Sequence, residues 1–174
     1  MIVLTVAVPA RSEQARIDQL QAKARNGMVS LSFQLANAFD YEEIRKALTS
    51  GLATGFTYHI ELVRSRPNWF DDTIASSRIE IICTYNSVTQ EYLLNYRHDR
   101  KLVRSEVYRD LNALQKAMTS VSEADFFSLG RYRPSKLIVR VRADVMQGYF
   151  LYVMPWQVST DWSHVRVALP KAGE

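Results

Sequence analysis

The side chains that could carry chemistry in this sequence are few, and they lie far apart. The three histidines are His59, His98 and His164, and no two of them have the close spacing of a zinc site. The single cysteine, Cys83, lies in the alternating segment RIEIICTYNS, which predicts a buried structural thiol and not a nucleophile. The six glycines form no phosphate-binding loop, and no Gly-x-Ser-x-Gly segment is present. We therefore predict no metal, no cofactor and no catalytic residues, and we expect the protein not to be an enzyme.

A charged loop with one tryptophan is the first candidate binding site. In the segment RSRPNWFDD, Arg64 and Arg66 precede Trp69, and Asp71 and Asp72 follow it. Two carboxylates can act as an acid and base pair, but adjacent residues do not provide the fixed gap that such catalysis needs. Two interpretations stay open. Either the loop binds a partner through its tryptophan and charges, or the tryptophan anchors the loop while the arginines pair with the aspartates.

A second candidate is a row of cations near residue 140. Lys136, Arg140 and Arg142 share one strand parity, and we call these three residues the basic stripe. The alternate positions are apolar: Leu137, Val139, Val141 and Ala143. Because the apolar parity is expected to face the core, the cations would project together from the opposite side. Such a stripe either meets lipid headgroups or an acidic partner, or it is a solvated sheet face.

The segment GYFLYVMPW, residues 148–156, is rich in aromatic and aliphatic side chains and does not alternate. It is too short to span a bilayer. We interpret it as a buried strand. If it is exposed instead, its aromatic residues would form a docking patch, because such residues are enriched in interface cores.

The elements that must position these side chains are mostly strands. Asn26-Gly27 lies between two alternating segments and is the strongest short signal for a β-hairpin. Asp40 and Glu43 then have the spacing of a capping box, and Gly51 lies where a helix would end. A short amphipathic helix is therefore predicted between them.

The rest of the chain predicts further strands and a second helix. The strand-like segments are 55–63, 78–86, 91–108, 135–145 and 163–169. The segment 91–108 reads as a hairpin that turns near Asp99, and Asp110 is expected to cap the second helix. The count is about seven strands and two short helices. We predict a mainly β fold, an antiparallel β-sandwich-like sheet with two short flanking helices. The alternative is an α+β fold with one curved antiparallel sheet covered by helices.

The chain opens with MIVLTVAVPA, which is almost free of polar groups and is followed by the polar segment RSEQA. Val8, Pro9 and Ala10 are typical of the region before a signal-peptide cleavage site, although the usual basic start is missing. We interpret residues 1–10 as the remnant of a signal peptide and residues 11–174 as a single globular domain. The predicted location is the periplasm. The alternative is a cytoplasmic protein in which Met1 is retained and these residues form a strand.

Composition sets limits on the partners. The 174 residues are 47% apolar and 23% charged, as in ordinary globular domains. The 22 Lys and Arg exceed the 18 Asp and Glu by only four, which is too small an excess to predict nucleic-acid binding. No apolar stretch approaches the roughly 20 residues of a transmembrane helix, so the protein is not expected to span a membrane.

Five segments taken together resemble the proteobacterial family of domain of unknown function 4390 (DUF4390). They are LSFQLANAF, ALTSGLATGFTYHIEL, RPNWFDD, TYNSVTQEYLL and STDW, and the resemblance covers about residues 16–165. The resemblance implies an export signal and a gene neighbour that encodes a membrane sensor histidine kinase of nitrogen-regulation type. It supplies no catalytic residues, and it suggests a periplasmic accessory role.

The predicted function is therefore a non-enzymatic protein-binding or accessory module of the periplasm or envelope, with a membrane sensor protein as a partner. The candidate binding residues are Trp69, Arg64, Arg66, Lys136, Arg140 and Arg142. The alternative is a carrier of a small ligand or lipid, in which tyrosines and phenylalanines line a cavity between two sheets. The oligomeric state is not predicted.

Overall fold

The computed structural model describes residues 14–66, 71–130, 132–150 and 154–169, and it places ten strands within these ranges. The strands are β1 (Arg16–Arg25), β2 (Met28–Ala36), β3 (Thr54–Arg64), β4 (Asp72–Asn86), β5 (Glu91–His98), β6 (Lys101–Tyr108), β7 (Ser120–Ser128), β8 (Leu137–Phe150), β9 (Met154–Ser159) and β10 (Ser163–Arg166). The helices are α1 (Glu42–Thr49) and α2 (Leu111–Thr119), with short 3-10 turns η1 (Ala38–Asp40) and η2 (Pro134–Lys136).

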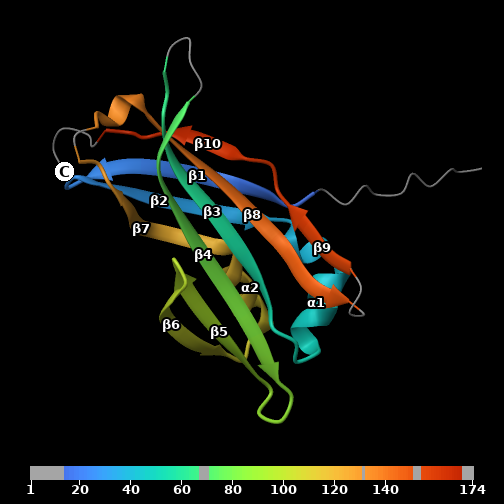
Figure 1. Ribbon diagram of the computed structural model, residues 1–174. Helices are drawn as coiled ribbons and strands as arrows, with labels where there is room; N and C mark the ends of the chain where they lie inside the picture. The colour runs from blue at the N-terminus through green and yellow to red at the C-terminus, as the bar shows by residue number, and fades with distance from the viewer. Residues whose placement is uncertain (1–13, 67–70, 131, 151–153, 170–174) are drawn as a thin grey trace, which may run out of the picture.

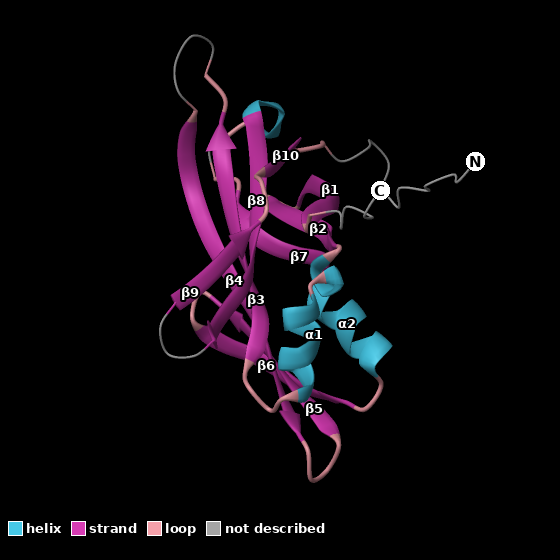
Figure 2. Ribbon diagram, turned by 90° about the vertical axis from the view of Figure 1, so that its right-hand side faces the viewer, coloured by secondary structure: helices cyan, strands magenta, loops and turns pink. Residues whose placement is uncertain are grey.

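The strands form two antiparallel sheets. The larger sheet has seven strands in the order β10-β8-β3-β4-β5-β6, with β9 also paired to β8, and the smaller sheet has the order β1-β2-β7. The smaller sheet lies behind the larger one (Figure 1). Helices α1 and α2 lie on the same side of the larger sheet as the smaller sheet does (Figure 2). The fold is thus mainly β and sandwich-like, as predicted, with the helices covering the part of the inner face that the smaller sheet leaves free.

Alternating apolar residues along β3 and β8 make the inner face of the larger sheet apolar. The buried apolar residues include Phe56, Tyr58, Ile60 and Leu62 on β3, and Leu137, Val139, Val141 and Ala143 on β8. The ring of Tyr58 packs edge to face on Phe33 of β2, with 5.1 Å between ring centres. The Tyr58 hydroxyl donates a hydrogen bond of 2.9 Å to the carbonyl oxygen of Met118. This face is therefore the core, where burial of apolar surface stabilises the fold.

Cys83 lies in this core on β4. Burial raises the pKa of its thiol to about 11. A thiol with a raised pKa is mostly protonated and therefore a poor nucleophile at neutral pH. The prediction of a buried structural cysteine is confirmed.

Two-residue turns set the register of two hairpins. Asn26 and Gly27 have φ of 50° and 75°, and Asp99 and Arg100 have φ of 46° and 70°. Two consecutive positive φ angles match the twist of paired antiparallel strands, and glycine adopts them without strain. Both predicted hairpin turns, between β1 and β2 and between β5 and β6, are confirmed.

The two helix starts differ in outcome. The carboxylate of Asp110 accepts a hydrogen bond of 2.7 Å from the backbone N–H of Ala113, so the predicted cap of α2 is confirmed. The predicted capping box at Asp40 is wrong. Asp40 belongs to η1, and α1 begins at Glu42 after Tyr41, which makes no side-chain cap. The 3-10 turn moves the cap position from Asp40 to Tyr41, so the helix starts one residue later than predicted.

Two strands of the structure were not predicted as separate elements. β7 follows α2 directly and pairs with β2, but the register shifts twice along that pair. Each shift breaks the alternation that predicts a strand. β9 starts within the segment 148–156, whose first residues continue β8 to Phe150. The side chains of that segment lie outside the described residues, as do residues 1–10.

The segment after β10 joins the two sheets. The Val167 N–H donates to the carbonyl oxygen of Leu137 on β8 at 3.0 Å. Ala168 exchanges two backbone hydrogen bonds with β1, to Ala22 at 2.8 Å and from Ala24 at 2.9 Å. Main-chain hydrogen bonds of this segment thereby link β1 of the smaller sheet to β8 of the larger sheet.

Candidate functional site

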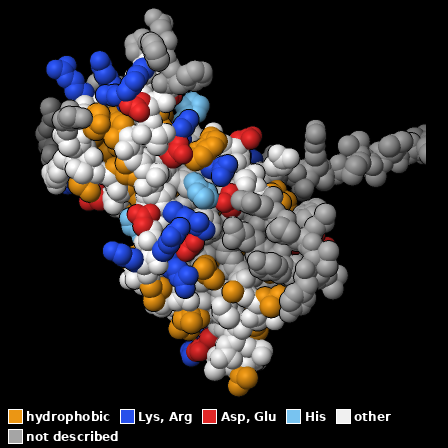
Figure 3. Space-filling model, viewed as in Figure 1, with side chains coloured by type: hydrophobic (Ala, Val, Ile, Leu, Met, Phe, Trp, Pro, Cys, Tyr) orange, Lys and Arg blue, Asp and Glu red, His pale blue; other side chains and the backbone are white. Residues whose placement is uncertain are grey.

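The candidate site is the outer face of the larger sheet, where β3, β4 and β8 lie side by side. Side chains alternate along a strand, so the residues between the core positions all project from this face. We call the following residues the outer-face cluster: His59, Glu61, Arg78, Glu80, Arg140, Arg142, Asp144 and Trp162. The register places His59 opposite Arg78 on one side and Arg142 on the other. Basic, acidic and histidine side chains are mixed across this face (Figure 3).

Asp144 is the most buried charged member of the cluster, with a side chain only 4% exposed. One of its oxygens lies 2.7 Å from Nε2 of His59, and the other accepts a 2.7 Å hydrogen bond from the hydroxyl of Ser159. Nε of Arg142 lies 3.8 Å from the carboxylate. Burial alone would raise the pKa of Asp144, but the hydrogen bonds from Ser159 and His59, together with nearby positive charge, hold the pKa below its usual range. Asp144 is therefore ionised, and Nε2 of His59 carries the proton that it donates.

The arginines of the cluster are held in fixed orientations. Arg140 donates a 2.6 Å hydrogen bond to Glu61 on the neighbouring strand, and Arg78 lies 2.7 Å from Glu80 on its own strand. The ring of Trp162 lies 5.6 Å from the guanidinium of Arg140 and 5.1 Å from that of Arg142. Guanidinium groups over an aromatic face are attracted by its quadrupole, which restrains both groups. The surface is thus ordered before any partner arrives.

Two further arginines extend this surface. Arg97 on β5 lies opposite Glu80, and Arg166 on β10 lies opposite Ile138. With them, the surface carries five arginines against the carboxylates Glu61, Glu80 and Asp144, an excess of two positive charges with the histidines neutral. Such a surface favours acidic groups on a partner.

In the charged segment 64–72, the described residues show the pairing of the two arginines with one of the two aspartates. Arg64 and Arg66 both donate to one oxygen of Asp72, at 2.7 and 2.6 Å. The hydrogen bond from Arg64 is the main reason why the pKa of Asp72 lies below its usual range. Trp69 lies outside the described residues. The two arginines are therefore paired locally, at one end of β3.

The prediction that the basic stripe forms one row along a strand is wrong, because Lys136 is not part of the strand. Lys136 belongs to the 3-10 turn before β8, and its carbonyl oxygen accepts a 3.1 Å hydrogen bond from the Ser65 N–H. Arg140 and Arg142 do project from the outer face, but each lies beside a carboxylate. The stripe is thus part of a mixed-charge cluster, because β3 places Glu61 against β8.

The sequence analysis did not assign His59, Glu61, Asp144 or Trp162 to this site. β3 and β8 are about 80 residues apart in the chain, and local patterns do not reveal which strands pair. One signal was available. The segments TYHIEL and STDW, two of those that carry the family resemblance, supply His59, Glu61, Ser159 and Trp162.

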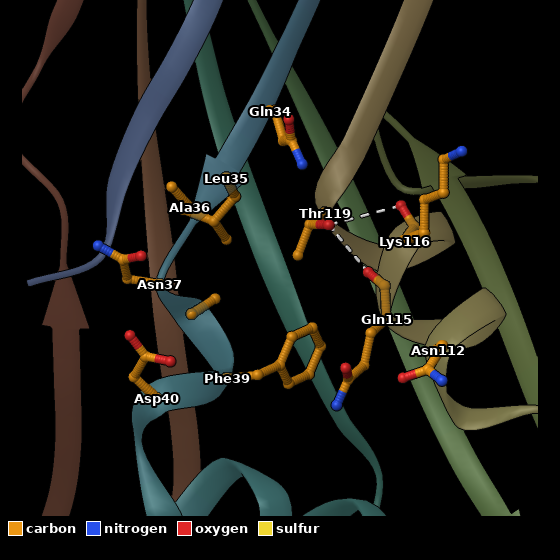
Figure 4. Close-up of a pocket in the computed structure, with 11 residues that line it drawn as sticks. Gln34, Leu35, Ala36, Asn37, Phe39, Asp40, Asn112, Gln115, Lys116 and Thr119 are labelled. Atoms are coloured by element: carbon orange, nitrogen blue, oxygen red, sulfur yellow. Dashed lines mark hydrogen bonds between the residues drawn. The ribbon is translucent and has the colours of Figure 1, made fainter. Parts of the chain in front are cut away.

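A shallow groove of about 430 Å³ lies between η1 and α2 (Figure 4). Its lining includes Phe39, Asn112 and Lys116. The hydroxyl of Thr119, at its edge, donates 2.9 Å to the carbonyl oxygen of Gln115 within the same helix. The groove is thus lined by a mixture of polar and apolar side chains. It is a weaker candidate than the outer-face cluster.

The histidines do not meet. His59 pairs with Asp144, whereas Nε2 of His98 lies 2.6 Å from the hydroxyl of Ser77 and His164 lies opposite Arg140 on the outer face. Within the described ranges, no three His, Cys, Asp or Glu side chains gather as a metal-binding group. No helix among the described residues is long and apolar enough to cross a membrane.

Comparison with known protein families gives one match. The model of the family described as a domain of unknown function (DUF4390) matches residues 12–166. No curated protein and no solved structure matches the chain.

Proposed function

The chain belongs to the DUF4390 family, and from this premise we propose that it is a non-enzymatic binding module of the bacterial periplasm whose outer-face cluster docks a partner protein. The partner that we propose is the sensor region of a membrane histidine kinase. The observation that carries the proposal is the set of oriented arginines around Trp162 on an open sheet face.

Arginine and tryptophan are the residues most enriched among those that dominate binding energy in protein interfaces. Here Arg140 and Arg142 share one tryptophan ring, and a salt bridge to Glu61 restrains Arg140. Groups that are already ordered lose little conformational entropy when a partner binds. This preorganisation supports docking of a folded partner with acidic groups.

The chemistry of the cluster favours binding over catalysis. His59 donates to a buried carboxylate, which is how a catalytic histidine is oriented. However, the hydroxyl of the neighbouring Ser159 donates to the same carboxylate and not to the histidine. The described cluster therefore has an orienting acid and a base, and it lacks a nucleophile positioned by that base.

The carrier alternative receives less support from the interior. Phe33 and Tyr58 pack against each other between the two sheets, and Phe39 packs on Phe56 with 5.5 Å between ring centres. These aromatic side chains pack on one another in the region where the carrier alternative places a ligand. Native mass spectrometry of the purified protein tests this alternative directly, since a carrier would retain an apolar ligand.

The binding proposal is tested with purified proteins. The double variant Arg140→Gln, Arg142→Gln removes two charges from the cluster without adding a repulsive one. We expect it to weaken binding to the purified sensor region of a membrane histidine kinase of nitrogen-regulation type by about tenfold or more, measured by isothermal titration calorimetry. The wild-type affinity should also fall as salt is added, because screening weakens interactions between exposed charges.

The matched control removes two charges elsewhere. Arg25 and Lys116 are exposed cations away from the cluster, in the β1–β2 hairpin and in α2. Arg25→Gln, Lys116→Gln should bind as the wild type does. Equal losses in both double variants would show a general charge effect and would contradict docking at the cluster, as would unchanged binding in the Arg140, Arg142 variant.

Export is tested separately. The intact mass of the native protein, measured in periplasmic and cytoplasmic fractions of its source cells, shows where it resides and where it starts. We expect a periplasmic species that starts near Arg11. A cytoplasmic species that retains Met1 would contradict the periplasmic location.

A further inference from the structure

The free edge of the larger sheet is an uncovered apolar strand. Among the described residues, β6 is the last strand in the sheet order and pairs only with β5. Its apolar side chains Leu102, Val103 and Val107 are 60%, 64% and 59% exposed. Leu93 on β5 lies opposite Val107 and is exposed as well. An edge strand with open main-chain groups and apolar side chains is a template for pairing with another strand.

The sequence of β6 is complementary to itself. The residues Val103, Arg104, Ser105, Glu106 and Val107 read as a palindrome about Ser105 in which arginine is exchanged for glutamate. When two such strands run antiparallel with Ser105 opposite itself, Arg104 of each copy faces Glu106 of the other. Val103 of each copy then faces Val107 of the other. Opposite charges and apolar pairs directly across two antiparallel strands stabilise their pairing.

Geometry limits the registers that compete with this one. Residues directly opposite each other in an antiparallel pair lie on the same face of the sheet. Adjacent residues point to opposite faces, so residues with consecutive numbers cannot lie opposite each other. A two-fold axis between two copies of β6 must therefore pass midway between a residue and the same residue of the other copy. Near the middle of the strand the axis can pass through Arg104, Ser105 or Glu106. The first and last choices place like charges opposite each other, which is destabilising.

The fold leaves this part of β6 available. From Arg104 to Tyr108 the strand pairs with β5 in regular register, and the one-residue register shift falls at Val103, the first residue of the palindrome. The guanidinium of Arg104 lies 3.8 Å from the ring centre of Tyr96, and its Nε lies 3.4 Å from Glu106 on the same strand. The two charges are thus already side by side on one face, where the reversed pair of a second copy would meet them.

We propose that β6 is a homodimer interface at which two copies of this chain join their larger sheets through antiparallel β6 strands, with Ser105 on the two-fold axis. Isologous two-fold contacts of this kind are the commonest in homo-oligomers. The contact of two single strands is smaller than a standard interface, so the association is weak and depends on protein concentration. The inference does not rest on the proposed function, because it concerns the β6 edge of the sheet and not the outer-face cluster on β3, β4 and β8.

Sedimentation equilibrium over a range of protein concentrations, with charge-reversal variants, tests this dimer. Arg104→Glu and Glu106→Arg should each weaken dimerisation about tenfold or more, because two attractive pairs become two repulsive pairs. The double variant Arg104→Glu, Glu106→Arg exchanges the two charges and should restore the dimer. A wild-type protein that stays monomeric at every concentration, or a double variant no better than the single variants, would overturn the proposal.

A cross-linking experiment tests the register. Ser105→Cys places two thiols opposite each other on the axis, and mild oxidation should convert the dimer to a covalent one. Val88→Cys, in the exposed turn between β4 and β5, is the matched control and should cross-link far less. Equal cross-linking of the two variants would indicate random collision and would contradict the register. Binding of β6 to another protein instead of a second copy would show as a wild-type monomer in both experiments.

Discussion

β3 and β6 belong to the same sheet and differ in how their side chains are satisfied. β3 is paired on both sides, its apolar residues are buried, and its outer charges have partners on β8. β6 is paired on one side, and its apolar side chains remain exposed. The difference shows what completes a strand in this sheet: a covered inner face and a paired strand on each side.

The comparison also separates two kinds of surface. Around β3 and β8, charges are already paired, so a partner would meet an ordered and mixed-charge surface. At β6, apolar side chains and one edge of the strand lack a second neighbour among the described residues. We therefore expect the first region to bind a different protein and the second to bind its own copy. The four experiments below test whether the two regions differ as described.

The largest difference is expected in the apolar residues. Ile60 on β3 is completely buried, and Ile60→Ala should destabilise the protein by about 2–5 kcal/mol, because it leaves a cavity. Val107→Ala on β6 should change the free energy of unfolding by no more than about 0.5 kcal/mol. Urea unfolding at low protein concentration measures both. Similar losses in the two variants would show that β6 is as well packed as β3.

The next difference concerns the charged residues. Asp144→Ala leaves the N–H of His59 and the hydroxyl of Ser159 without their acceptor, so we expect a loss of about 1–3 kcal/mol. Asp144→Asn retains an acceptor oxygen and should lose less. Glu106→Ala on the exposed β6 should cost only about 0.5 kcal/mol. If Asp144→Ala is as mild as Glu106→Ala, the cluster around Asp144 does not stabilise the fold.

The contribution of Asp144 to the stability of the fold should depend on pH. The pKa of Asp144 is lower in the folded protein than its ordinary value near 4. The unfolded chain therefore binds a proton more readily, and the contribution of Asp144 to stability is present above about pH 4 and is lost as the pH falls through the folded pKa. The wild type should lose more stability than Asp144→Asn between about pH 5 and pH 3, measured by urea unfolding. Parallel pH profiles for the two proteins would contradict a lowered pKa at Asp144.

The smallest effect is expected for Arg140. Its side chain and that of its partner Glu61 are 35% and 26% exposed, and partly exposed salt bridges contribute little. Arg140→Gln should therefore reduce the free energy of unfolding by about 0.5 kcal/mol in thermal or urea unfolding. A small effect on stability beside a large effect on partner binding would identify a binding residue. A large loss of stability would instead make Arg140 a structural residue.

Much of the fold could be predicted from local patterns. Asn26-Gly27 forms the predicted hairpin turn, and Asp110 caps the predicted helix. The alternation that placed Val139 and Val141 in the core is confirmed, as is the buried position of Cys83. Each of these features depends on the conformation or the spacing of residues that are near one another in the chain, and that information is present in the sequence.

The elements that were missed depend on distant partners. β7 lacks a clean alternation because its register against β2 shifts twice, and Asp40 gave way to a helix start at Glu42 because a 3-10 turn intervenes. Lys136 shares the parity of Arg140 but belongs to a turn before the strand. The pairing of β7 with β2 and the hydrogen bond from Ser65 to Lys136 join residues that are far apart in the chain, so local patterns did not reveal them.

The sequence by itself determined which residues face inward and where the chain turns, because side-chain alternation and turn conformation are local properties. The tertiary structure alone decided which charges meet. Asp144 binds His59, and Glu61 binds Arg140, because β8 pairs with β3 across about 80 residues of chain. The pairing of distant strands is set by the fit of whole sheets and their core. It is this pairing that turned a predicted row of cations into a mixed-charge surface.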